Sequence, residues 1–112
     1  VPAHILQPIV ENAIRHGLYQ KLEGGRIIIR IDKQKNSFRI AVIDDGLGMT
    51  SDRLKHIFDN TKHKNSIGLT NVNQRLITLY GPKNKLKIYS SMNNGTIVIM
   101  KIPFQEVSEN ND

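Results

Sequence analysis

Apolar residues at the start of the chain recur at the spacing of an amphipathic helix. They are Ile5, Leu6, Ile9, Val10, Ala13 and Ile14. This spacing collects them into one stripe, so we expect a helix that begins near Pro2 and ends at Gly17. Pro8 lies inside this segment and should kink or restart the helix. Four polar residues fall opposite the stripe, and they are Glu11, Asn12, Arg15 and His16. They form either a solvated face with a Glu11–Arg15 surface pair or one side of a binding site.

Alternating apolar residues predict an antiparallel hairpin over residues 26–33 and 37–43. Phe38, Ile40 and Val42 share one face of the second strand, and alternate isoleucines from Ile27 to Ile31 share one face of the first. We therefore expect this hairpin to cover a core on at least one side.

The second strand runs directly into the sequence Asp44-Asp45-Gly46-Leu47-Gly48. An ionised carboxylate at the end of a buried strand is costly unless a donor satisfies it. Glycines one residue apart allow positive φ and a close approach of the backbone to a flat or anionic ligand. The simpler alternative is a tight turn that an aspartate caps.

The rest of the chain continues with helices and a final hairpin. A short helix should begin at residue 51 and carry Leu54, Ile57 and Phe58 inward. Residues 59–66 contain no apolar side chain and predict a loop, after which Ile67-Gly68-Leu69 opens a helix that Gly81-Pro82 closes. Residues 85–90 and 96–103 predict the last hairpin. The predicted fold class is α/β, a two-layer α+β sandwich with a mixed sheet and helices on one face.

Length and composition are consistent with one domain over residues 1–104 and a polar tail over residues 105–112 of the 112-residue chain. The net charge of +6 invites a nucleic-acid partner, but the basic residues are scattered and Trp is absent, so we expect none. Cysteine is also absent, which excludes disulfides and thiolate metal sites. Because the chain opens at Val1 and enters a helix at once, we expect it to be a piece of a longer protein.

Three segments, in this order, resemble the N, G1 and G2 boxes of the GHKL ATPases (gyrase, heat-shock chaperone, histidine kinase, MutL) with the Bergerat nucleotide-binding fold. They are the helix face with Glu11-Asn12, the strand end from Asp44 to Gly48, and Ile67-Gly68-Leu69. Residues 6–17 (LQPIVENAIRHG) with residues 71–76 (NVNQRL) and Tyr80-Gly81 are similar to the LytS/YesM-type branch of sensor histidine kinases.

The resemblance implies that the domain binds ATP and Mg²⁺ and that specific residues hold them. Asn12 would coordinate the metal, Glu11 would polarise the attacking group, and Asp44 would accept from the adenine amino group. Further nucleotide contacts would come from Arg15, His16, Asp45, Gly46, Gly48, Met49, Lys62, Ser66, Ile67, Gly68, Leu69 and Thr96. Residues 59–66 would form a lid over the phosphates.

Three positions depart from the family pattern. Pro8 stands where many histidine kinases have an earlier asparagine, Asp45 stands in place of the usual asparagine, and Ser66 occupies a site that is often glycine. Asp45 brings an extra negative charge toward the nucleotide, which would weaken binding unless its side chain points to solvent or caps the turn.

The resemblance also implies partners and a location. The γ-phosphate would pass to a histidine on a dimerisation domain outside this chain, and then to a response regulator. The parent would be a membrane-anchored homodimer in a two-component phosphorelay, with this domain in the cytoplasm. We therefore expect the isolated chain to bind ATP without autophosphorylating. Alternatives with the same fold are a GHKL ATPase, an anti-sigma serine kinase and a non-catalytic nucleotide-binding module.

Overall fold

The computed structural model describes residues 3–14, 25–58 and 67–104. Its elements are α1 (Ala3–Asn12), β1 (Ile27–Lys33), β2 (Ser37–Asp44), α2 (Ser51–Lys55), α3 (Ile67–Tyr80), the 3₁₀ turn η3 (Pro82–Asn84), β3 (Lys87–Ser90) and β4 (Thr96–Pro103). Every predicted helix and strand is present within these ranges, with ends that shift by a few residues. The strand β3 starts at Lys87, two residues later than predicted, and the backbone N–H of Leu86 donates to the side chain of Asn73 in α3 at 2.8 Å instead of to a strand.

The four described strands form one sheet in the order β1-β2-β4-β3, and each neighbouring pair is antiparallel. The prediction of a mixed sheet was therefore wrong. The chain does cross over from β2 through α2 and α3 to β3, and these two strands run in the same direction. However, β4 lies between them and pairs with both, so the parallel relation never appears between neighbours.

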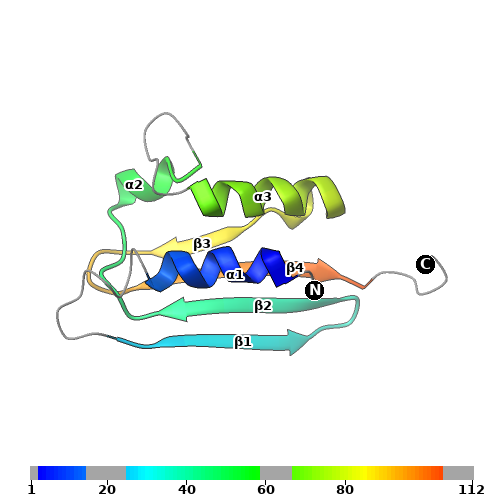
Figure 1. Ribbon diagram of the computed structural model, residues 1–112, viewed down its shortest axis with the longest axis horizontal. Coiled ribbons are helices and arrows are strands. Elements are labelled where there is room, and N and C mark those ends of the chain that lie inside the picture. Colours follow the sequence, from blue (N-terminus) through cyan, green and yellow to red (C-terminus); the bar gives the residue numbers. More distant parts are fainter. Residues whose placement is uncertain (1–2, 15–24, 59–66, 105–112) are drawn as a thin grey trace.

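The helices pack on one face of the sheet and form the second layer, as predicted (Figure 1). Ile9 of α1 and the buried residues of α3 meet the inward side chains of the two central strands. The residues in this core include Ile9, Leu69, Val72, Leu76, Ile40, Val42, Val98 and Met100. Burial of these side chains is the main force that holds the two layers together.

The edge strand β1 lies largely outside the helix layer (Figure 1). Ile27 packs against the core, whereas Ile29 and Ile31 are 44% and 60% exposed. Their partners in the β1–β2 ladder, Val42 and Ile40, are both 1% exposed. The alternation of the strand was thus predicted correctly, but α1 and α3 cover the core only as far as β2.

The first helix runs through Pro8 and ends at Asn12, before a π-helical turn at Ala13 and Ile14. Ala13 is buried, while Ile14 is 44% exposed. The prediction that Ile14 belongs to the apolar stripe was wrong, because the wider turn rotates it away from the position that an α-helix would give it. None of the helices in the described ranges is long and apolar enough to cross a membrane.

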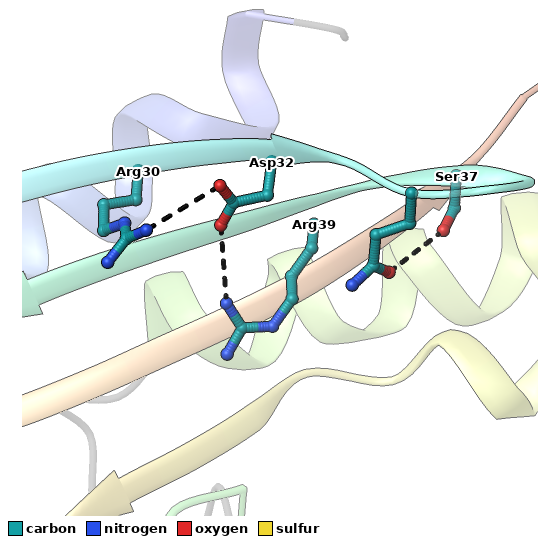
Figure 2. A network of polar contacts seen from close by, with 5 residues as sticks. Arg30, Asp32, Ser37 and Arg39 are labelled. Carbon is teal, nitrogen blue, oxygen red and sulfur yellow. Dashed lines mark hydrogen bonds and ion pairs between the residues drawn. The ribbon is translucent and has the colours of Figure 1, made fainter.

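The face of the sheet away from the helices is polar at the β1–β2 hairpin (Figure 2). Asp32 is paired with Arg39 in the ladder and lies 3.8 Å from Arg30 and 3.9 Å from Arg39. Ser37 donates to Gln34 at the turn. The charged side chains are between 39% and 63% exposed, so these ion pairs add little stability. They do provide exposed charges that are remote from the helix layer.

Candidate functional site

A pocket that is partly open to solvent lies between α1, α2 and one end of the sheet. Its polar side chains are those of Asn12, Asp44, Arg53 and Thr96. The apolar residues and the glycine in its lining are Ile9, Ala13, Val42, Gly48, Met49, Ile57 and Val98. A largely apolar cavity with a few convergent polar groups is typical of a small-molecule site.

Asp44 stands at the last position of β2 and is 6% exposed. Its Oδ1 accepts the backbone N–H of Gly46 at 2.9 Å. Burial raises the pKa of the Asp44 carboxyl above its ordinary value, and the nearby Asp45 charge raises it further, while the N–H groups of Gly46 and Thr96 act in the opposite direction. The hydrogen bond from the Gly46 N–H therefore holds the carboxylate in place. Because Asp44 lines the pocket, a ligand bound there could donate a second hydrogen bond to it.

Thr96 is brought beside Asp44 by the register of the sheet. The ladder pairs Asp44 with Thr96 and Thr96 with Ser90, so three strands meet at this end of the pocket. The Ser90 hydroxyl lies 2.9 Å from the Thr96 hydroxyl, donates to the Gly95 carbonyl at 2.8 Å and accepts the Met49 N–H at 2.9 Å. Ser90 thereby links the loop after β2 to the β3–β4 hairpin and fixes both walls.

Gly48 lines the pocket with a φ of +75°, and it is the member of the predicted glycine pair with positive φ. A Cβ at this position would collide with the carbonyl oxygen of Ser91 in the β3–β4 turn. The loop and the turn are further joined by the Asn93 N–H, which donates to the Leu47 carbonyl. From the sequence, this glycine was expected to allow a ligand to approach the backbone closely. In the structure, the absence of a Cβ is required by the β3–β4 hairpin that packs against it.

Asn12 ends α1 and is half-buried in the pocket lining. Glu11 is exposed, accepts a hydrogen bond from Gln7 Nε2 at 3.0 Å and does not line the pocket. Within the described ranges, no group of three or more His, Cys, Asp or Glu residues could hold a metal ion by itself. A divalent cation at Asn12 would thus need most of its oxygen ligands from elsewhere, which suits a phosphate-bound ion.

The other predicted contact residues are placed less centrally. Asp45 is exposed, and its carboxylate accepts the Arg26 N–H at 2.8 Å, so it points toward the start of β1. Gly46 is buried beside Asp44 without lining the pocket. In α3, Gly68 packs near Pro8 of α1, and Leu69 is fully buried in the core. Some predicted contact residues lie outside the described part of the chain, namely Arg15, His16, Lys62, Ser66 and the side chain of Ile67.

Sequence reasoning missed Arg53 and Ile57 as pocket residues. The signal for them was available, because they are four residues apart in a predicted helix that follows the glycine loop, so they share one face. Ile57 was predicted to point inward, but Arg53 was not considered. Ser90 was also missed, although the tight turn before Gly95 sets the register that places it opposite Thr96.

Known proteins resemble this chain in sequence and in fold. Residues 2–106 match the family model "Histidine kinase-, DNA gyrase B-, and HSP90-like ATPase". The chain is 36% identical over 107 residues to the sensor protein kinase HptS of Staphylococcus aureus strain USA300, with 88% of this chain and 20% of HptS covered. The same values hold for HptS of strain NCTC 8325. The chain thus spans about a fifth of the length of these relatives.

Solved structures share the fold. The histidine kinase domain of the blue-light activated histidine kinase EL346 from Erythrobacter litoralis superposes with a TM-score of 0.64 at 23% identity, covering 89% of this chain and 44% of that one. A second structure of EL346 gives the same TM-score, and the match covers 88% of this chain and 28% of that one. The fold and the matched family model lead to one conclusion: this chain belongs to the histidine kinase-, DNA gyrase B- and HSP90-like ATPases.

Proposed function

We propose that this chain is the catalytic ATP-binding domain of a sensor histidine kinase, which binds Mg-ATP and presents the γ-phosphate to a histidine on a separate dimerisation domain. The observation that supports this most directly is that Asn12 and Asp44 line one pocket. The relative HptS carries the name of a sensor protein kinase.

Adenine would occupy the end of the pocket at Asp44. The buried carboxylate would accept a hydrogen bond from the exocyclic amino group of adenine. Guanine would present a carbonyl oxygen to the same position, and the two oxygens would repel each other. A hydrogen bond that involves a charged group contributes about 1.5 to 3 kcal/mol. Met49 and Ile57 supply apolar surface for the flat base, and Thr96 supports the same wall.

Phosphates and the metal would lie toward Asn12. The amide oxygen of Asn12 is a hard neutral ligand that fits Mg²⁺ when phosphate oxygens and water complete the shell. The bound ion would neutralise phosphate charge during transfer. Glu11, adjacent in sequence, would orient the attacking group. Arg15 and His16 would contact the phosphates or the ribose, and Gly68 with Leu69 would frame the phosphates. Further nucleotide contacts would come from Lys62, Ser66 and Ile67.

The whole protein would be a homodimeric sensor that signals through a response regulator, with this domain on the cytoplasmic side of a membrane. The phosphoacceptor histidine would lie outside the chain. Among the described histidines, His56 is half-buried and lies 3.9 Å from Asp52 on the short helix α2, which is a poor setting for an acceptor. Positioning and charge neutralisation would therefore be the catalytic contribution of this domain.

Calorimetry with ATP, with and without Mg²⁺, tests the proposal when it is combined with phosphorylation assays. We expect measurable, Mg²⁺-dependent ATP affinity and no acid-labile phosphate on the isolated chain. Acid-labile phosphate on the isolated chain would contradict the separate-acceptor mechanism. Steady phosphate release would indicate an ATPase, phosphate on a partner serine would indicate a serine kinase, and absence of ATP binding would leave a non-catalytic domain.

A further inference from the structure

Arg53 lines the pocket and carries an unused hydrogen-bond donor. It lies in the middle of α2, where its backbone N–H donates to the capping Thr50 hydroxyl at 3.1 Å. Its side chain lines the pocket, and its Nε atom is buried without a hydrogen-bond partner. Leaving a buried donor unsatisfied is unfavourable, so an acceptor that enters the pocket would restore the lost hydrogen bond.

The arginines of the described sheet behave differently. Arg30 and Arg39 both lie near Asp32 on the solvent face of the sheet, as Figure 2 shows. On α2, the His56 Nε2 lies 3.9 Å from the Asp52 carboxylate, and Arg53 takes no part in this contact. In the part of the chain that the structure describes, the Arg53 guanidinium therefore has no carboxylate partner.

The polar lining of the pocket indicates which part of a nucleotide Arg53 would contact. Asp44 can take the amino group of adenine, and the remaining polar positions of the adenine ring are the acceptor nitrogens N1, N3 and N7. Arginine is a donor only, so it complements these positions and cannot compete for the amino group. Met49 and Ile57, which line the pocket with Arg53, provide apolar surface of the kind that a base requires and a phosphate does not.

We propose that Arg53 is an adenine-contacting residue that donates its Nε–H to a ring nitrogen of the bound base. This inference rests on the proposed function, because it assumes that the pocket takes ATP. Asp44 and Arg53 would then form an acceptor and donor pair that recognises the base from two elements, β2 and α2.

The test measures the affinity of ATP and of adenosine for the wild-type chain and for three variants. Arg53→Met keeps the apolar stem, and Arg53→Lys keeps the charge but lacks the Nε–H. Arg30→Met removes the same charge from the far side of the sheet and serves as the control. We expect both Arg53 variants to bind ATP and adenosine about tenfold more weakly, by the same factor for both ligands, and Arg30→Met to bind like the wild type. Thermal melts of all variants establish that they are folded.

Base analogues then locate the acceptor. The 1-deaza, 3-deaza and 7-deaza forms of ATP each lack one ring nitrogen. We expect one of them to bind the wild type more weakly than ATP does. The same analogue should bind Arg53→Met with the same affinity as ATP. A loss confined to ATP, with adenosine unaffected, would assign Arg53 to the phosphates and overturn the inference. Unchanged ATP affinity in Arg53→Met would overturn this inference alone, whereas absence of ATP binding to the wild type would overturn the proposed function as well.

Discussion

Asn12 and Asp44 line the same pocket from opposite layers of the fold, the first at the end of helix α1 and the second at the end of strand β2. Ile9 of α1 and Val42 and Val98 of the central strands belong to one buried cluster, which holds the helix layer against the sheet. The amide proposed to bind the metal and the carboxylate proposed to recognise the base therefore line one pocket without being close in sequence. The two ends of the pocket can be tested separately.

Replacing Asp44 by asparagine should reduce the preference for adenine. The asparagine Oδ1 can still accept the Gly46 N–H, so the turn is retained, but the charge that strengthens the bond to the amino group is lost. We expect ATP affinity to fall about tenfold or more and the ATP-to-GTP affinity ratio to decrease. Asp32→Asn, which removes an exposed carboxylate on the other face, is the control. An unchanged ratio in Asp44→Asn would argue against base recognition by this residue.

The same residue should make stability depend on pH. Because the folded chain raises the pKa of Asp44, its protonated form stabilises the fold below the ordinary pKa, and this contribution is lost as the pH rises through the folded pKa. Asp44→Asn cannot lose a proton there. Melting temperatures of the two proteins should therefore diverge in favour of Asp44→Asn as the pH rises from about 3 to 7. A difference that is independent of pH would contradict the raised pKa.

ATP binding should have the opposite pH dependence to stability. The nucleotide needs the ionised Asp44 carboxylate as an acceptor, so affinity should increase as the pH rises through the folded pKa. Calorimetric titrations at several pH values would follow this increase, and it should be absent from Asp44→Asn. The buried acid thus destabilises the empty domain in the same pH range in which it favours the ligand.

Replacing Asn12 by alanine should remove the Mg²⁺ dependence of ATP affinity. The side chain is the one predicted metal ligand among the residues that line the pocket, and the exposed helical amide of Asn71 offers a matched control. We expect Asn12→Ala to bind ATP equally well with and without Mg²⁺, while Asn71→Ala retains the wild-type difference. If Asn12→Ala retained the difference as well, the metal would be held elsewhere.

The sequence predicted the elements of this fold well because its apolar periodicity is strong in the buried positions. Ile40, Val42, Val98 and Met100 alternate along the central strands, and all four are buried. It could not predict how far the helix layer extends, so Ile31, which has the same pattern, proved to be exposed. The strand order was equally hidden, because insertion of β4 beside β2 is a property of long-range packing.

Some of the predicted site residues line the pocket because their position follows from the element that carries them. Asp44 ends one predicted strand and Thr96 begins another, and both line the pocket. Their pairing across β2 and β4 is a long-range contact that the hairpin turns do not determine. Arg53 was missed because its role depends on the angle at which α2 leaves the glycine loop. Asp45 looked like part of the site from its neighbours, yet its carboxylate accepts from Arg26 at the start of β1.

Alanine substitutions at Gly48 and Gly81 separate two contributions to the free energy of unfolding. One is the strain of a positive φ, and the other is the collision of the added Cβ with a neighbouring atom. Both glycines have positive φ, of +75° and +98°, so alanine is strained at either position. At Gly81 a Cβ would meet nothing within 4 Å, whereas at Gly48 it would collide with the Ser91 carbonyl. We expect Gly81→Ala to lower the free energy of unfolding by about 1 to 2 kcal/mol.

Gly48→Ala should cost at least about 2 kcal/mol more than Gly81→Ala, because the β3–β4 turn must move away from the loop after β2. Urea denaturation measures both values. Displacement of that turn would also disturb the Ser90 hydroxyl that holds the Met49 N–H and Thr96, so ATP affinity should fall in Gly48→Ala and persist in Gly81→Ala. Equal losses of stability in the two variants would mean that the loop and the turn are not in contact, and the pocket would lose the wall that they form together.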